Sequence, residues 1–199
     1  MDQSKAVVTK EADELATVQR LGGLLAAAGY FSDAAQMAQA AVKVMAGREL
    51  GIPAIASMMG IHIIKGKVAL SAHMMASRVR AHGYDFRHKE LTDAGCTLEF
   101  LSRTDSDGKR HVLGESSFTS ADAKRAEINN ENYKKYPRNM YFSRAMSNGV
   151  KWYTPEVTCG IPLYVPEELG ANVDEEGNVV IEPLKPVQAI TVTPSPTAP

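Results

Sequence analysis

The sequence predicts one α+β domain in which an antiparallel sheet, a hairpin plus a three-stranded meander, packs against helices. Three observations predict this class: helical spacing of apolar residues near the N-terminus, alternating β-branched runs in the middle, and a long amphipathic segment before Pro155. A chain of 199 residues with 44% hydrophobic and 23% charged residues is sufficient for one such core. We expect a flexible N-terminus over 1–12, the domain over 13–170 and a disordered, acidic, proline-rich tail over 171–199.

Two helices are expected before the first strand. Apolar residues at helical spacing predict one over 13–28, although Gly22-Gly23 weakens its middle. Another helix, rich in alanine, covers 34–50. Gly51, followed two residues later by Pro53, is a strong stop signal, so we expect this helix to end there.

The best-defined local unit follows this stop signal. After a short apolar connector, β-branched residues flank a Lys-Gly-Lys tripeptide over 65–67, which predicts a hairpin over 61–70 with both lysines at its tip. Ser71 is placed to cap the following helix, which carries Arg78 and Arg80. One side of that helix is expected to pack while the other stays basic.

Three strands and a short helix are expected next. Partial alternation of apolar and polar residues predicts strands over 84–91, 96–103 and 110–118, separated by turn-forming sequences. We expect them to form an antiparallel meander that extends the sheet begun by the hairpin. A short helix then begins at residue 119 or 120, with Asp122 near its positive end.

A long helix is predicted between Pro137, which suits its first turn, and Pro155, which limits its end. Four apolar residues at spacings of four, four and three form the side expected to pack: Phe142, Met146, Val150 and Tyr153. Basic, aromatic and polar residues form the side expected to face solvent: Arg138, Tyr141, Arg144, Asn148 and Lys151. Lys134 and Lys135 stand just before this helix.

Charge is distributed unevenly along the chain, although the formal net charge is only −1. The range 61–151 holds 16 Lys+Arg and 10 Asp+Glu, a balance of +6, whereas from Pro166 onward six acidic residues accompany a single lysine. A basic body with an acidic tail indicates a polyanion partner, with an ordinary solvated surface as the alternative. The sequence shows no apolar run of membrane-spanning length and no hydrophobic signal core, so we expect a cytoplasmic protein without membrane contact.

Sequence signatures of catalytic and cofactor sites are absent. There is no nucleophile elbow and no HExxH, Walker or GxGxxG motif. Cys96 and Cys159 lie far apart without a CxxC motif, so both are expected to be buried free thiols, and the histidines form no metal-ligand pair. We therefore expect a non-catalytic protein without metal or cofactor. A metal-dependent nuclease that uses Asp85, Glu90 and Glu99 stays as an alternative.

The remaining chemistry is that of a nucleic-acid binder. Single-strand binders need cations that follow phosphates and flat rings that stack on bases. The basic residues are interleaved with Tyr133, Tyr136, Tyr141 and Trp152, with closure of the core as the alternative role of these rings. We expect DNA contacts from Lys65, Lys67, Arg78, Arg80, Lys134, Lys135, Tyr136, Arg138, Tyr141, Arg144 and Lys151.

Four segments taken together resemble the RecT-like single-strand annealing proteins of phages and prophages: AGRELGIP, IIKGK, DAKRAE and NYKKYPRNMYFSRAMSNG. The resemblance extends over 36–169 and implies a compact α+β domain in which a sheet and a long helix flank a narrow basic groove. Proteins of this family assemble as rings or helical filaments, bind single-stranded DNA along the groove, and anneal a complementary strand without ATP. The resemblance places in the groove Lys65, Lys67, Lys134, Lys135, Arg138 and Arg144, with Lys124 and Arg125 as weaker candidates.

The resemblance also implies partners. Family members typically act with an exonuclease that produces the single strand and with the host single-strand binding protein. This chain is shorter than many relatives and carries an acidic tail, which implies a modest, salt-sensitive DNA affinity. A structural or interaction protein of a phage, with a basic protein-binding surface, is a further alternative.

Overall fold

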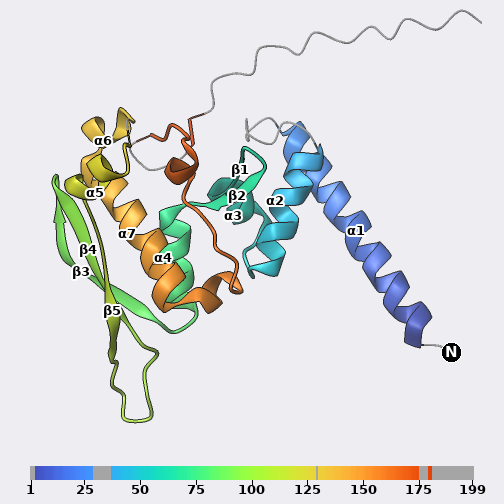
Figure 1. Ribbon diagram of the computed structural model, residues 1–199. Helices are drawn as coiled ribbons and strands as arrows, with labels where there is room; N and C mark the ends of the chain where they lie inside the picture. Colours follow the sequence, from blue (N-terminus) through green and yellow to red (C-terminus); the bar gives the residue numbers. More distant parts are fainter. Residues whose placement is uncertain (1–2, 29–36, 129, 175–178, 181–199) are drawn as a thin grey trace, which may run out of the picture.

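Helices and antiparallel strands make up the chain, which confirms the predicted α+β class (Figure 1). The structure is a computed structural model that describes residues 3–28, 37–128, 130–174 and 179–180. The α-helices are α1 (Gln3–Ala27), α2 (Met37–Glu49), α3 (Ala54–Gly60), α4 (Ala72–Ala81), α5 (Ser120–Arg125), α6 (Asn132–Lys135) and α7 (Pro137–Tyr153). The short 3-10 helices are η2 (Pro155–Thr158) and η3 (Pro166–Leu169). The strands are β1 (Ile61–Ile64), β2 (Lys67–Leu70), β3 (Asp85–Thr92), β4 (Gly95–Leu101) and β5 (Val112–Thr119).

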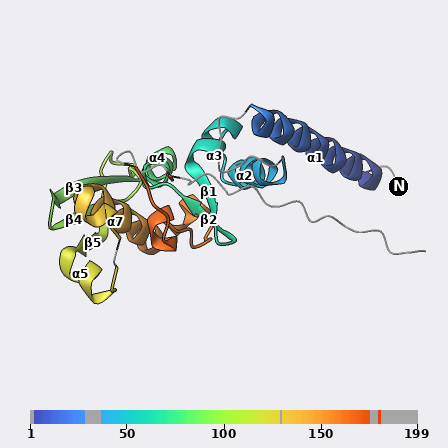
Figure 2. The ribbon, with the colours of Figure 1, turned by 90° about the horizontal axis from the view of Figure 1, so that it is seen from above.

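The N-terminal helices α1 and α2 pack against each other and, together with α3, form a small core separate from the main one. In Figures 1 and 2, α1 extends away from the rest of the molecule. It begins at Gln3, so the start predicted at residue 13 is wrong, because the alanine, lysine and glutamate residues before it are good helix formers. The buried apolar residues of this core are Val18, Leu25, Ala40, Val44 and Met58.

The segment between α2 and the hairpin differs from the prediction. α2 ends at Glu49 and Gly51 adopts a φ of 67°, which confirms the stop signal. The connector that follows is helical and forms α3, whose first turn closes when the Ser57 N–H donates to the Pro53 carbonyl at 2.8 Å. A run of 7 residues is too short to reveal a helical period in the sequence.

The hairpin and the cap after it are confirmed. β1 and β2 pair from Ile61↔Leu70 to Ile64↔Lys67. Lys65 and Gly66 form the turn with φ values of 51° and 74°, the positive values that suit the twist of a two-residue hairpin. The Ser71 hydroxyl accepts the Met74 N–H at 3.3 Å and so caps α4.

The strands form two sheets, not the single continuous sheet that the sequence predicted. β3, β4 and β5 form the expected antiparallel meander, and β1 and β2 form a separate sheet. The C-terminal segment occupies the edge of β2: the Leu70 N–H donates to the Tyr164 carbonyl at 2.8 Å, and Ala69 forms a parallel bridge with Tyr164. Tyr164 thus supplies a backbone hydrogen bond at the edge of β2, where the prediction had placed a strand of the meander.

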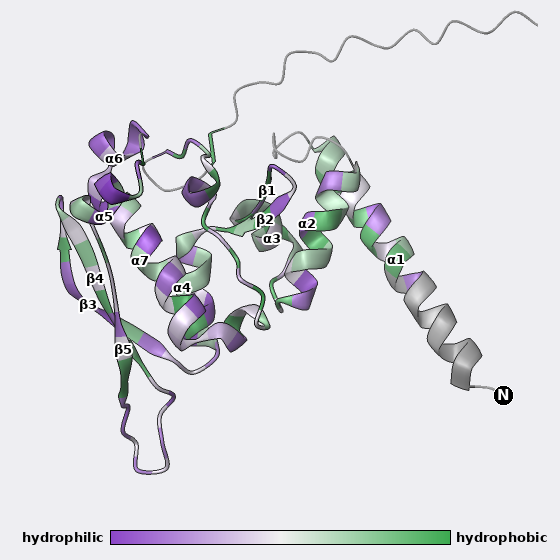
Figure 3. Cartoon of the chain, viewed as in Figure 1, coloured by the Kyte–Doolittle hydropathy of each residue, from purple (hydrophilic) through white to green (hydrophobic). Residues whose placement is uncertain are grey.

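α7 packs on the three-stranded sheet and supplies much of the main core. It begins at Pro137 as predicted, and Met146 and Val150 are buried in this core while Phe142 and Tyr153 are half-buried. Figure 3 shows hydrophilic and hydrophobic residues alternating along α7, whereas α6 is mostly hydrophilic. α7 therefore carries the packed side that its spacing predicted.

The chain around α5 and α6 is held by local polar contacts. As predicted, a short helix begins after Thr119, whose hydroxyl accepts the Asp122 N–H at 3.3 Å while the Asp122 carboxylate accepts the Thr119 N–H at 2.9 Å. The single turn of α6 was not predicted. From the predicted tail, Val173 and Val179 form an antiparallel bridge, and 175–178 and 181–199 lie outside the described residues.

The two cysteines are free thiols in different environments. Cys96 is buried as predicted, and desolvation raises the pKa of its thiol to about 12. Cys159 is exposed, so the prediction of a buried thiol is wrong for this residue. It ends η2 in the left-handed conformation, with a φ of 55°, in a turn at the surface.

Candidate nucleic-acid interface

The two elements predicted to bind DNA meet at the segment Tyr164–Gly170, which we call the C-terminal strap. Lys67 of the hairpin lies over the Tyr164 ring, with 5.3 Å from its Nζ to the ring centroid. Lys151 of α7 lies over the same ring at 4.7 Å. Hairpin and helix are therefore neighbours, but the strap lies between their cations.

The strap also places a carboxylate against α7. Glu168 Oε2 lies 3.0 Å from Lys151 Nζ and 3.6 Å from Arg144 Nη1. The side chain of Glu168 is 7% exposed, and those of Arg144 and Lys151 are 20% and 22% exposed. The prediction that this side of α7 faces solvent is wrong for these two cations, because the strap folds back over the helix.

Tyr141 and Arg78 are buried, although both were predicted to contact DNA at the surface. Tyr141 is 5% exposed, and its ring lies 5.6 Å from that of Tyr133 and 6.5 Å from that of Phe118. Arg78 is 7% exposed; its Nε donates to the Val157 carbonyl at 2.6 Å, and its Nη1 donates to the Leu50 carbonyl. Neither side chain is available to a phosphate in this arrangement.

The other predicted cations are exposed: Lys65, Lys67, Arg80, Lys134, Lys135 and Arg138. Three of them form surface ion pairs, Arg80 with Asp85 at 3.2 Å, Lys134 with Glu131 at 2.9 Å and Arg138 with Asp93 at 2.8 Å. Such exposed pairs contribute little stability, so a phosphate can replace the carboxylate at small cost. Lys65, Lys67 and Lys135 form no ion pair with a carboxylate of the described residues.

A cavity of about 860 Å³ lies beside the strap, on the side of α5 and α6. Tyr136, one of the predicted contacts, is half-buried on its wall next to Lys135. On another side of the strap, a Cβ added to Gly170 would lie 3.4 Å from Lys65 Nζ. Four of the predicted cations thus border the strap, Lys65, Lys67, Arg144 and Lys151, and Lys135 lines the cavity beside it.

Glu167 is the second acidic side chain of the strap and is 9% exposed. Desolvation raises the pKa of its carboxyl above the ordinary value of 4.5, and the charge of Glu168 raises it further, whereas Ser143 and Arg144 act in the opposite direction. One carboxylate oxygen, Oε2, has no hydrogen-bond partner among the described residues. The folded protein therefore binds this proton more tightly than the unfolded chain does.

Glu167→Gln is therefore expected to increase the free energy of unfolding at pH 8. The wild type loses stability as the pH rises above 4.5 toward the raised folded-state pKa, and the neutral amide avoids this loss. At pH 4 the difference is expected to be much smaller, because Glu167 is then protonated in the folded protein and mostly protonated in the unfolded chain. Urea unfolding at both pH values measures the difference, and Glu168→Gln is the control, since loss of its ion pairs lowers stability at pH 8. An equal effect of Glu167→Gln at both pH values would contradict a raised pKa.

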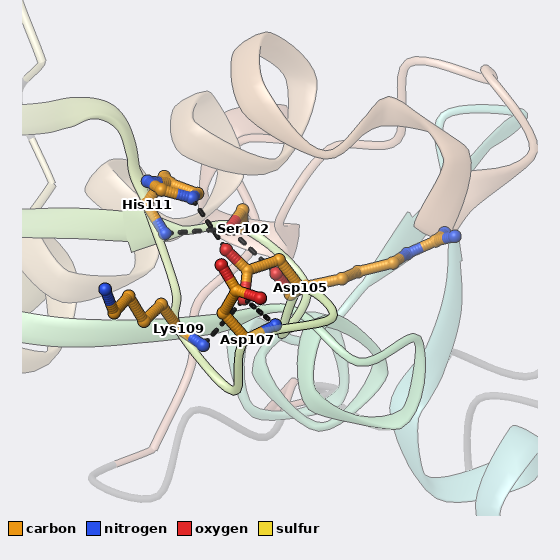
Figure 4. A network of polar contacts seen from close by, with 6 residues as sticks. Ser102, Asp105, Asp107, Lys109 and His111 are labelled. Carbon is orange, nitrogen blue, oxygen red and sulfur yellow. Dashed lines mark hydrogen bonds and ion pairs between the residues drawn. The ribbon is translucent and has the colours of Figure 1, made fainter.

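Two of the carboxylates that the nuclease alternative would use form ion pairs with different arginines. Asp85 pairs with Arg80, and Glu99 pairs with Arg87 at 2.5 Å. Within the described part of the chain, no three His, Cys, Asp or Glu side chains are grouped to hold a metal ion. The acidic loop between β4 and β5 is also internally bonded (Figure 4).

In that loop, Asp105 Oδ1 accepts the Asp107 and Lys109 N–H groups at 2.9 and 2.8 Å, and Oδ2 lies 3.0 Å from His111 Nε2. The hydrogen bond from the Lys109 N–H is the main reason why the pKa of Asp105 lies below its usual value. The Asp105 carboxylate therefore shapes the turn, in agreement with the turn-forming sequence expected between the last two strands of the meander.

Comparisons with known proteins give no relative: no protein family matches the sequence, and no match is found among functionally described proteins or among solved structures. In the described residues, no helix combines the length and apolar character needed to cross a membrane. Two residues that border the predicted cations, Tyr164 and Glu168, were not predicted as site residues. The only signal for Glu168 in the sequence was the acidic pair 167–168, which resembles the start of an acidic tail, and no pattern indicated Tyr164.

Proposed function

We propose that this protein binds single-stranded DNA and anneals complementary strands without ATP. The observation that carries this proposal is a group of exposed cations beside the C-terminal strap: Lys65, Lys67 and Lys135 form no ion pair with a carboxylate of the described residues. Exposed cations from different elements beside one segment can contact a phosphate chain without reading its bases. The order of the four segments that resemble RecT-like proteins supports the same interpretation.

The proposal includes an assembly and a cellular setting. A protein that anneals strands must hold an extended single strand, which favours a homo-oligomeric ring or helical filament over a single subunit. The resemblance adds a phage exonuclease and host single-strand binding protein as partners, in the cytoplasm. Electron microscopy of the protein with and without single-stranded DNA tests this part, with DNA-dependent rings or filaments as the expected result.

Annealing of two complementary oligonucleotides, one carrying a dye and the other a quencher, tests the activity itself. The protein is expected to accelerate annealing at low salt without ATP, and no acceleration would overturn the proposal. Cleavage of labelled DNA with Mg²⁺ that EDTA abolishes would instead favour the nuclease. Oligomers that bind no single-stranded DNA would favour the structural or interaction protein.

Neutralising the hairpin tip with Lys65→Gln and Lys67→Gln is expected to weaken binding to all single-stranded sequences alike. Log affinity falls with log salt, and on single strands each phosphate contact contributes about 0.7 to the steepness of this fall. The slope of the double variant is therefore expected to be less negative by about 1.4. Fluorescence anisotropy at several salt concentrations measures this slope. Lys109→Gln, an exposed lysine of the β4–β5 loop, is the matched control and is expected to leave the slope unchanged. An unchanged slope in the double variant would exclude the hairpin from the interface.

A further inference from the structure

Three rings from three different elements meet at the surface beside the edge strand β3. His73 of α4 and Phe142 of α7 have ring centroids 6.0 Å apart, and Phe142 and His88 of β3 have centroids 5.6 Å apart. Both imidazoles are exposed and Phe142 is half-buried. We call His73, His88 and Phe142 the ring surface. The elements that carry it all contact one another in the fold.

Exposed guanidinium groups stand next to the ring surface. Arg80 follows His73 by two turns on the same face of α4, and its guanidinium lies 4.6 Å from the ring of Phe86, which itself contacts His88 at 5.9 Å. Arg138 precedes Phe142 by one turn of α7. Each arginine side chain is 62% exposed, and within the described residues its ion pair is with one surface carboxylate, Asp85 for Arg80 and Asp93 for Arg138. Exposed cations therefore stand on the same helices as two of the rings, Arg80 with His73 on α4 and Arg138 with Phe142 on α7.

Core packing and metal binding both fit these rings less well than contact with a ligand. Core packing accounts for part of the Phe142 ring, which lies against the main core, but not for the two imidazoles, which are exposed. A metal site does not account for them either, since no third ligating side chain joins the two histidines in the described part of the chain. An arrangement of accessible rings flanked by guanidiniums matches the chemistry of unpaired nucleobases, which stack on imidazole and phenyl faces while their phosphates contact arginine.

We infer that the ring surface stacks the unpaired bases of single-stranded DNA, with Arg80 and Arg138 on the adjoining phosphates. This inference rests on the proposed function and deepens it, because it assigns base contacts to residues that neither charge nor motif had indicated. Stacking of this kind is tolerant of sequence, as every base has a flat face. The bases and the phosphates of the strand would then contact different side chains of the same surface.

The test compares binding of an oligothymidine with binding of an abasic oligonucleotide of the same length. The double variant His73→Ala, His88→Ala is expected to bind the oligothymidine about 10-fold or more weakly than the wild type, because each stacked base contributes appreciably to affinity. Its binding to the abasic strand is expected to be unchanged. His111→Ala, which removes an exposed imidazole of the distant β4–β5 loop, is the control and is expected to change neither.

The outcomes separate the inference from the function on which it rests. Unchanged oligothymidine binding by the double variant, or equal weakening for both strands, would overturn base stacking while leaving DNA binding intact. A wild type that binds neither strand would overturn the proposed function itself. Because the variant can lose its fold, imidazole NMR signals of the wild type give a second measurement: His73 and His88 are expected to shift on addition of oligothymidine, and unshifted signals would overturn the inference.

Discussion

Replacing Phe100 with alanine is expected to lower the free energy of unfolding by about 4 kcal/mol. The ring is fully buried in the main core, and its centroid lies 6.2 Å from that of Phe86 and 5.8 Å from that of Tyr153. These neighbours belong to a sheet and a helix that are fixed by other contacts, so the cavity cannot close completely. Urea unfolding followed by circular dichroism measures the loss, provided that the m-value is unchanged.

A double-mutant cycle with Gly149 tests the same contact from the other side. A Cβ at this position of α7 would overlap Cε2 of Phe100. Gly149→Ala alone is expected to cost about 2 kcal/mol, because overpacking outweighs a gain of about 1 kcal/mol in helix propensity. In the Phe100→Ala background the same substitution is expected to stabilise, which gives a coupling of about 3 kcal/mol. Additive effects would contradict direct packing of the helix on this ring.

The features that the sequence predicted correctly have local causes. The hairpin depends on a turn in which Lys65 and Gly66 take positive φ, and the start of α4 depends on a hydroxyl three residues before the N–H that it accepts. The start of α7 depends on Pro137. In each case the residues that decide the geometry lie within one turn of chain, so their pattern is visible without knowledge of the fold.

The features that were missed depend on contacts between distant parts of the chain. Spacing alone indicates that Arg144 and Lys151 share a side of α7, but not that Glu168 covers them. In the same way, the edge of β2 is occupied by Tyr164 rather than by the meander. A basic helix side has the same sequence pattern whether its partner is a phosphate or an intramolecular carboxylate.

Part of the candidate site could therefore be predicted, and part could not. The exposed cations at the hairpin tip and before α7 could be predicted from turn chemistry and charge, because lysine and arginine are rarely buried. The ring surface could not be predicted from the sequence, because His73, His88 and Phe142 come together only when three elements have packed. Phe142 was in fact assigned to the packed side of its helix, where it is only half-buried.

Arg78 gives the second large expected effect, and it separates a structural role from the predicted contact with DNA. Its guanidinium bonds the carbonyls of Leu50 and Val157, the latter 79 residues away in the sequence, and thus ties α4 to the chain after α2 and to η2. Arg78→Met is expected to lower the free energy of unfolding by about 3 kcal/mol, because two carbonyl groups lose their buried donors. Among the described residues no carboxylate forms an ion pair with Arg78, so the cost arises from these hydrogen bonds.

Arg80→Met is the matched control, two residues along the same helix. Its side chain is 62% exposed and, within the described part of the chain, its ion pair is with Asp85, so the expected loss of stability is about 0.5 kcal/mol. In DNA binding the order is expected to be reversed, with Arg80→Met affected more than Arg78→Met, as measured by anisotropy under conditions where both variants are folded. Arg80→Met weakens binding because it removes an accessible cation, whereas Arg78→Met leaves the affinity of the folded fraction unchanged. A stable Arg78→Met protein with weakened DNA binding would restore the surface role predicted from the sequence and contradict the buried one.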